Sequence, residues 1–157
     1  MSLDSPSTLV VEGATLKVGV VAARYNQRLV DGLLSRVRAV LADAGVGDEN
    51  VSVVRVPGSG ELPFAMQQLL AAREVDVGIA LGVVIKGGTM HDQLVAEGAQ
   101  NGLVRVGLDA RTPVIVGIVA ANNIEQAEAR CVGDINRGAE FARAALEMAA
   151  LKNQLSS

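Results

Sequence analysis

Two glycines, a threonine and the only histidine of the chain follow an apolar run that ends at Ile85. Gly87 and Gly88 lack a Cβ, so the backbone can turn sharply there and point its N–H groups at phosphate oxygens. A helix that began near Thr89 would add the attraction of its N-terminal dipole. Histidine ordinarily exchanges protons near neutral pH, so His91 suits proton transfer. The segment indicates an anion site beside a proton-transfer group, and the alternative is a plain turn with an exposed histidine.

Polar or glycine residues also follow the other apolar runs. The ring of Tyr25 follows the first run and can stack on a planar ligand or cap the core. Glu61 follows the second run, behind Ser59 and Gly60, and can accept hydrogen bonds from a ligand or complement a helix dipole. Asn122 follows the last run. Ligands of α/β proteins bind outside the carboxyl ends of the strands, so these loops are expected to converge.

Three cationic side chains and one thiol offer further chemistry. Arg130 and Arg137 lie beyond the last apolar run, where each can bind phosphate as a planar fork or remain solvated on a helix. Lys86 can form a Schiff base with a carbonyl substrate if it is desolvated, or it can lie at the surface. Cys131 is the only cysteine, which excludes an internal disulfide, and it is expected to be a small buried hydrophobe.

The composition limits the class of protein. The chain has 157 residues, enough for one domain, and half of them are hydrophobic although only Tyr25, Phe64 and Phe141 are aromatic. The net charge of −3 argues against general nucleic-acid binding. No apolar stretch approaches the roughly 18–20 residues of a membrane span, and the first residues lack the pattern of a signal peptide. We therefore expect a cytoplasmic protein that binds neither nucleic acid nor membrane.

Strand and helix patterns alternate along the chain without a linker or repeat. The strand candidates are near-continuous apolar runs, typical of a parallel sheet that helices cover on both faces. These strands are expected at 16–23, 51–56, 77–85 and 113–120. Apolar residues at helical spacing and cap residues predict the helices. They are expected between Asn26, which can cap the first helix, and Gly45, and then at 61–72, 91–106, 123–132 and 134–153. The alternation predicts a doubly wound α/β domain over residues 1–157.

Several segments occur in an order that is specific as a set. They are Arg24-Tyr25-Asn26, Val56-Pro57-Gly58-Ser59-Gly60-Glu61-Leu62-Pro63, Ala80-Leu81-Gly82-Val83-Val84-Ile85-Lys86-Gly87-Gly88-Thr89-Met90-His91, Thr112-Pro113-Val114-Ile115, Asn123-Ile124-Glu125-Gln126-Ala127, Arg130 and Asn136-Arg137-Gly138. Together they resemble the 6,7-dimethyl-8-ribityllumazine synthase family, over roughly residues 9–153. The resemblance implies a flavodoxin-like three-layer sandwich, in which helices flank a four-stranded parallel sheet.

The resemblance also implies an assembly. Members of this family form pentamers, which in some cases pair as decamers or close into hollow capsid-like shells, and their active sites lie between adjacent subunits. The N-terminal arm of one subunit typically adds a strand to the sheet of a neighbour. In this chain residues 1–15 carry Ser, Pro and Gly around Leu9-Val10-Val11, which indicates a loose arm or a short edge strand. This arm is the segment that can add a strand to a neighbouring subunit.

The implied activity is that of a transferase in riboflavin biosynthesis. It condenses 5-amino-6-(D-ribitylamino)uracil with 3,4-dihydroxy-2-butanone 4-phosphate and releases phosphate and water. No cofactor or metal is expected, because the amine of the substrate supplies the nucleophile. The expected partners are the two small-molecule substrates, other copies of the chain and riboflavin synthase.

The resemblance carries roles to individual residues. His91 is implied as the catalytic residue for proton transfer. The residues implied to bind substrate are Tyr25, Ser59, Gly60, Glu61, Val83, Ile85, Val116 and Arg137. The residues implied to bind the phosphate are Gly87, Gly88 and Thr89 from one subunit and Arg130 from the next.

The chain departs from the family pattern around the expected ring pocket. Gly60 and Val116 stand where members often carry an aromatic residue, so two walls of the pocket are thinner. Asp92 places a carboxylate directly after His91, where it can pair with the imidazole or point away from it. The loop before Arg137 is about one residue shorter than the common form. An alternative interpretation is therefore a weak or inactive paralogue that forms shells or binds flavin.

Overall fold

Four parallel strands form the central sheet in a computed structural model that describes residues 4–157. The strands are β1 (Val18–Ala23), β2 (Val51–Val56), β3 (Val77–Ile85) and β4 (Val114–Ala121), and their order across the sheet is β2-β1-β3-β4. β2 and β3 have the predicted bounds, whereas β1 begins two residues later than predicted and β4 is shifted by one residue. The doubly wound, flavodoxin-like α/β arrangement is confirmed.

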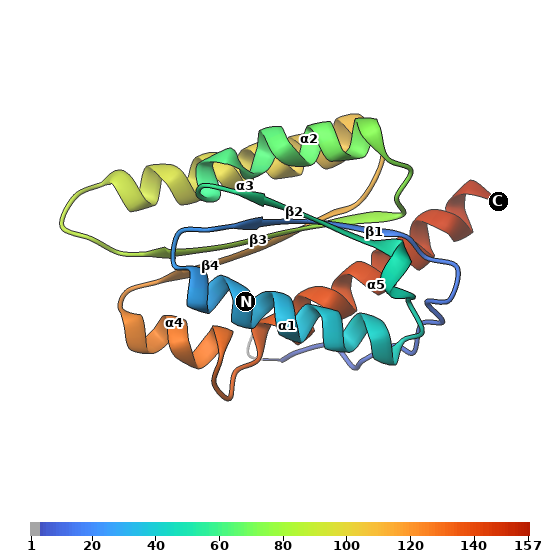
Figure 1. Cartoon of the computed structure of the whole chain (residues 1–157), viewed down its shortest axis with the longest axis horizontal. Helices are drawn as coiled ribbons and strands as arrows, with labels where there is room; N and C mark the ends of the chain where they lie inside the picture. Colours follow the sequence, from blue (N-terminus) through green and yellow to red (C-terminus); the bar gives the residue numbers. More distant parts are fainter. Residues whose placement is uncertain (1–3) are drawn as a thin grey trace.

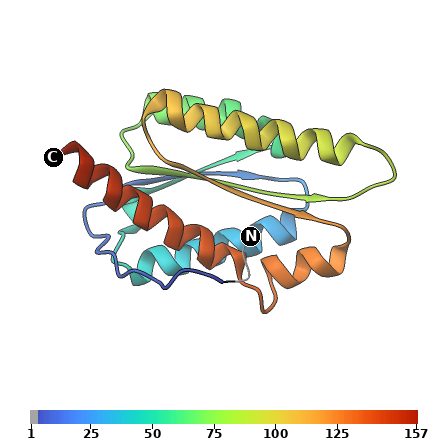
Figure 2. The same ribbon diagram turned by 180° about the vertical axis from the view of Figure 1, so that it is seen from behind.

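Helices cover both faces of the sheet and make a three-layer sandwich (Figures 1 and 2). One outer layer contains α2 (Leu62–Ala72) and α3 (His91–Ala110), and the other contains α1 (Gln27–Asp43), α4 (Ile124–Cys131) and α5 (Arg137–Ser156). Two short 3-10 turns, η1 (Asp48–Asn50) and η2 (Ser59–Glu61), lie directly before β2 and α2. None of the helices within residues 4–157 is long and apolar enough to cross a membrane.

Two apolar cores lie on opposite faces of the sheet. Along β1, Val20 and Ala22 belong to the core with α1 and α5, whereas Val21 and Ala23 belong to the core with α2 and α3. Successive strand residues point to opposite faces, so a strand that is buried on both faces needs an unbroken apolar sequence. This requirement explains why the strands stand out so clearly in the sequence.

Two helices depart from their predicted bounds by more than one residue. α3 continues past residue 106 to Ala110, because Arg111 adopts the left-handed conformation and its N–H closes the last turn on Gly107 and Leu108. α5 begins at Arg137 rather than near 134, because the side chain of Asn136 accepts the N–H of Ala139 and caps the helix there. Left-handed backbone suits glycine and asparagine best, so an arginine in that role gives no clear sequence signal.

The N-terminal arm forms no strand within residues 4–17, so the edge-strand alternative is wrong for the isolated chain. The arm is tied to the end of α1 by a hydrogen bond of 2.8 Å from the Gly13 N–H to the Ala44 carbonyl. Val11 packs against the larger core, whereas Leu9 and Val10 are exposed. The arm is therefore anchored at its base and presents an apolar pair to solvent.

Candidate active site

A cavity of about 400 Å³ lies at the carboxyl ends of β1, β2 and β3. Its wall consists of the loops after β1 and β2, the end of β3 and the first turns of α3, so two of the rim loops converge here as expected. The lining residues are Tyr25, Asn26, Gly58, Ser59, Gly60, Glu61, Val83, Val84, Ile85, His91, Asp92 and Val95. The structure thus brings together most of the residues that were predicted to bind the uracil substrate, and His91 with them.

Hydrogen bonds join the residues that follow β1 to the residues that follow β2. The backbone N–H groups of Arg24 and Tyr25 donate to the Pro57 carbonyl at 3.1 and 2.9 Å. A Cβ on Gly58 would lie 3.0 Å from the Tyr25 ring, so a glycine there permits this close approach. The Tyr25 side chain is 73% exposed and does not cap the core, which leaves a ring face available for stacking.

Asn26 lies at the start of α1, as predicted, but its side chain does not cap the helix. The backbone adopts the left-handed conformation with φ of 57°, and the side-chain amide donates to the Val83 carbonyl at 2.9 Å. The prediction of a side-chain cap is therefore wrong. Asparagine tolerates this conformation better than most residues, and no residue pattern indicated a hydrogen-bond partner on β3.

The loop after β2 presents a buried hydroxyl and a restrained carboxylate. Ser59 is only 4% exposed and lies against β3, where a Cβ on Gly82 would come within 2.3 Å of its Oγ. The Glu61 carboxylate accepts the N–H of Gly58 at 2.9 Å, which fixes its direction. Gly60 faces open space, since a Cβ there would meet no atom within 4 Å. In the family pattern described above, an aromatic side chain at this position would fill this space.

The loop after β3 connects the cavity to the N-terminus of α3. Its base is fixed by a hydrogen bond of 2.8 Å from the Lys86 N–H to the Ala121 carbonyl at the end of β4. Gly87 and Gly88 are exposed, and a Cβ on either would meet no atom within 4 Å. The Thr89 hydroxyl accepts the N–H of His91 at 3.3 Å. The glycine loop therefore adjoins the cavity and leaves room for an anion in front of a 20-residue helix.

Asp92 points toward the glycine loop. Its Oδ1 accepts the N–H of Gly87 at 3.3 Å, and no ion pair or hydrogen bond joins it to His91 among residues 4–157. Of the two orientations considered from the sequence, the structure has the one in which the carboxylate turns away from the imidazole.

Besides the glycine loop, which adjoins the cavity without lining it, three predicted site residues lie away from the cavity of their own chain. Val116 lies in the middle of β4, paired with Ala80, and packs against the core with α2 and α3. Arg130 lies on α4 and donates to the Gln126 carbonyl at 3.0 Å. Arg137 begins α5, with its Nε 2.7 Å from a carboxylate oxygen of Glu140 but without hydrogen-bond alignment. Both arginines belong to the helical layer on the opposite face of the sheet from α3 (Figure 1).

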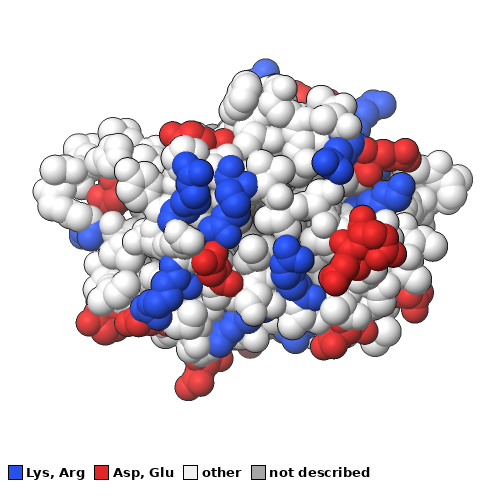
Figure 3. Space-filling view, in the orientation of Figure 1, with Lys and Arg blue, Asp and Glu red and all other residues white. Residues whose placement is uncertain are grey.

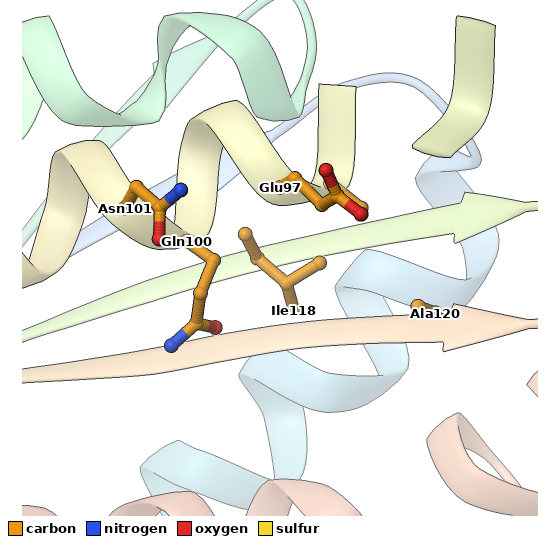
Figure 4. A pocket seen from close by; sticks show the side chains of 6 residues that line it. Glu97, Gln100, Asn101, Ile118 and Ala120 are labelled. Carbon is orange, nitrogen blue, oxygen red and sulfur yellow. The ribbon is translucent and has the colours of Figure 1, made fainter. Parts of the chain in front are cut away.

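A second cavity of about 450 Å³ lies between α3 and β4, at the open edge of the sheet. Figure 4 shows Glu97, Gln100 and Asn101 on α3 above Ile118 and Ala120 on β4. Side chains on alternate residues of a strand share a face, so Val116 continues this row. This cavity holds neither the histidine nor the glycine loop, so the rim cavity is the candidate for chemistry.

Charged side chains of both signs lie outside the rim cavity. The face in Figure 3 carries basic and acidic side chains interspersed, and ion pairs join Arg28 to Glu128 and Arg55 to Asp31. The part of the chain that the structure describes contains no cluster of His, Cys, Asp and Glu that could hold a metal ion. Cys131 is fully buried, as expected, and burial raises the pKa of its thiol to about 11.

Comparisons with known proteins agree with this geometry. The family model described as 6,7-dimethyl-8-ribityllumazine synthase matches residues 15–153. A protein of that name from Paracidovorax citrulli is 41% identical over 146 residues, which cover 93% of each chain. Similar proteins of the same name are 43% identical in Stenotrophomonas maltophilia strain K279a, over 88% of this chain and 90% of that protein, and 41% identical in Cupriavidus necator, over 97% and 89%.

Proposed function

Since the chain belongs to the 6,7-dimethyl-8-ribityllumazine synthase family, we propose that its rim cavity binds the two substrates with the residues argued below. The protein is a transferase of riboflavin biosynthesis that condenses 5-amino-6-(D-ribitylamino)uracil with 3,4-dihydroxy-2-butanone 4-phosphate. One observation carries the assignment of the site: a single cavity is lined by the aromatic ring, the polar β2 loop, the end of β3 and the histidine.

The uracil substrate lies between the exits of β1 and β3. The exposed ring of Tyr25 stacks on the pyrimidine, and Val83 and Ile85 line the other side of the ring pocket. Ser59 and Glu61 hold the ribityl hydroxyls, since a buried hydroxyl and a carboxylate of fixed direction supply both a donor and acceptors. Gly60 leaves the remaining wall open.

The butanone phosphate lies at the glycine loop. Gly87, Gly88 and Thr89 offer N–H groups and a hydroxyl to the phosphate, and the N-terminal dipole of α3 favours its charge. The 5-amino group attacks the ketone carbon and water leaves as the Schiff base forms. Phosphate is then eliminated, and the ribitylamino nitrogen closes the ring with loss of a second water. These steps move several protons, and His91 at the cavity wall is the group to carry them.

An adjacent subunit completes the site. The proposal assigns Val116 to the ring pocket, Arg130 to the phosphate and Arg137 to the substrate of a neighbouring copy. The separation of these residues from the rim cavity of their own chain supports this division. The expected assembly is built from pentamers, either free, paired as decamers or closed into a capsid-like shell. In it the N-terminal arm predicted over 1–15, of which the structure describes residues 4–15, adds a strand to a neighbour, and riboflavin synthase is a partner.

A steady-state assay with both substrates tests the proposed function. Formation of the lumazine product and of inorganic phosphate in equal amounts is expected. The same assay addresses the paralogue alternative, which the departures at Gly60 and Val116 raised and the comparisons do not support. A protein that copurifies with yellow flavin and makes no product at saturating substrate would overturn the proposal. The expected cytoplasmic location stays a prediction.

A further inference from the structure

A carboxylate accepts a hydrogen bond from one of the N–H groups of the glycine loop. Asp92 is the second residue of α3, and its Oδ1 accepts the Gly87 N–H at 3.3 Å. Met90, at the cap position of this helix, makes no side-chain cap hydrogen bond. The acceptor for the Gly87 N–H instead comes from Asp92 within the first turn of the helix. The side chain thus reaches back along the loop residues 87–90 to Gly87, and Asp92 also lines the cavity wall.

The same N–H group belongs to the proposed phosphate cradle. A backbone N–H has one hydrogen to donate, so Gly87 cannot give a full hydrogen bond to Asp92 and to a phosphate oxygen together. The carboxylate also carries a negative charge that repels a phosphate dianion at close range. The contact is long and exposed, which makes it weak and easy to displace.

We propose that Asp92 sets the affinity of the phosphate site by competing with the substrate. In the free protein the Asp92 carboxylate takes one of the positions that a phosphate oxygen occupies, and it leaves Gly87 when the butanone phosphate binds. This inference rests on the proposed function of the glycine loop, and it adds a residue that opposes phosphate binding rather than supporting it. The structure leaves space for the exchange, since no atom lies within 4 Å of a Cβ at Gly87 or Gly88.

A structural role for Asp92 would predict the opposite effect on phosphate affinity. If Asp92 were a clamp that holds the loop in its binding conformation, its loss would weaken phosphate binding, and an asparagine would replace it well because the amide oxygen still accepts the Gly87 N–H. If Asp92 is a competitor, removal of the charge strengthens binding, and removal of both charge and acceptor strengthens it further.

The experiment measures phosphate affinity in Asp92→Asn and Asp92→Ala. Two quantities are read: the dissociation constant of inorganic phosphate by calorimetric titration, and the KM for the butanone phosphate. We expect both constants to fall about tenfold in Asp92→Ala and somewhat less in Asp92→Asn, as repulsion at a few ångströms in water implies. The KM for the uracil substrate should change less than these two constants, because Tyr25, Val83 and Ile85 of the proposed ring pocket are unchanged.

Asp109→Asn is the matched control. Asp109 lies at the far end of α3, is exposed and pairs only with Arg105 at 3.5 Å, so the variant makes the same change of charge away from the loop. Its phosphate constants should equal those of the parent, since surface ion pairs contribute little. An equal gain in Asp109→Asn and Asp92→Asn would reduce the effect to net charge and overturn the proposal.

Unchanged or weakened phosphate binding in Asp92→Ala also overturns the competitor role, as does a complete lack of phosphate binding by parent and variants. The direct titration keeps this result separate from the proposed function. If the parent makes no product but Asp92→Ala binds phosphate more tightly than the parent, the proposed function fails and the role of Asp92 stands.

Discussion

The side-chain amide of Asn26 donates a hydrogen bond to the Val83 carbonyl of β3 beyond the point where the neighbouring strand β1 ends. β1 pairs with β3 only as far as Ala22 and Leu81, whereas β3 continues to Ile85. The Val83 carbonyl therefore has no partner on β1, and Asn26 Nδ2 donates to it at 2.9 Å. One side chain in this way fixes the loop that carries Tyr25 against the strand that forms the opposite wall of the ring pocket.

Loss of this hydrogen bond should weaken binding of the uracil substrate. In Asn26→Gly the left-handed backbone is retained and only the side chain is lost, so the free energy of unfolding falls by about 1 kcal/mol. Asn26→Ala loses the same bond and also meets the left-handed strain, so its loss is about 2–3 kcal/mol. We expect the KM for the uracil substrate to rise several-fold in both, with kcat less affected. Equal stability of the two variants and the parent would show that the bond does not position the loop.

Replacement of His91 should slow the chemical step without preventing it. Proton transfer by a positioned side chain typically contributes about 10²–10⁴-fold, while positioning of two substrates supplies much of the remaining acceleration. His91→Ala and His91→Gln are expected to lower kcat by about 10²-fold, the lower end of that range, with both KM values within about threefold of the parent. His91 is exposed and not part of the core, so thermal unfolding should be unchanged. An unaltered kcat in both variants would remove His91 from the mechanism.

The open space at Gly60 should accept a side chain, in contrast to Gly82. A Cβ at Gly60 meets no atom within 4 Å, so Gly60→Ala should change the free energy of unfolding by less than about 0.5 kcal/mol. Gly60→Phe supplies the missing aromatic wall and should lower the KM for the uracil substrate about 3–10-fold.

Gly82→Ala is the control, because its Cβ would come within 2.3 Å of the buried Ser59 hydroxyl. We expect it to cost about 1–3 kcal/mol of stability and to raise the same KM. A higher KM in Gly60→Phe would mean that the open wall is occupied by substrate or by a neighbouring subunit.

The buried thiol of Cys131 predicts a loss of stability in alkali. Its pKa is about 11 in the folded protein against an ordinary value of 9.0, chiefly because burial disfavours the thiolate. The folded protein therefore keeps the thiol neutral at pH values where the unfolded chain ionises it. The stability that the neutral thiol contributes, up to about 2–3 kcal/mol, is fully present below pH 9 and is lost as the pH rises toward 11.

Between pH 8 and 10.5 the parent should lose about 1–2 kcal/mol more unfolding free energy than Cys131→Ala. The other titrating groups are common to both proteins, so they cancel in this difference. Parallel curves of stability against pH would contradict the assignment of the shift to burial.

The sequence predicted the sheet well for a physical reason. Strands buried on both faces must be apolar throughout, as the alternation of Val20 and Val21 between the two cores illustrates. Helix ends were less clear, since Arg111 ends α3 in a conformation that arginine seldom adopts and the side chain of Asn136 caps α5 three residues after the predicted start. The rim position of Tyr25, Glu61 and His91 followed from the general rule for doubly wound sheets.

Contacts between separate loops lay beyond what the sequence could predict. The Asn26 bond depends on β3 being longer than its neighbour β1, and the Asp92 contact depends on how the glycine loop folds back. Neither follows from residue types at a spacing. Val116 and Arg130 lie outside the rim cavity of their own chain, and the proposal that they serve a neighbouring copy concerns contacts that one chain does not contain.

Mixed oligomers should reveal whether each site takes residues from two subunits. Arg130→Ala and a double variant, Glu61→Ala with His91→Ala, each damage a different half of the proposed site. If Arg130 serves the cavity of a neighbour, every site in either pure oligomer is defective, whereas random mixing in equal amounts produces about a quarter of sites with both halves intact. Coexpressed protein should therefore regain about a quarter of the parent activity, and separately purified oligomers mixed without exchange should regain none. Recovery is impossible if Arg130 and His91 of the same chain form one site, so equal inactivity of coexpressed and separately purified samples would refute the shared site.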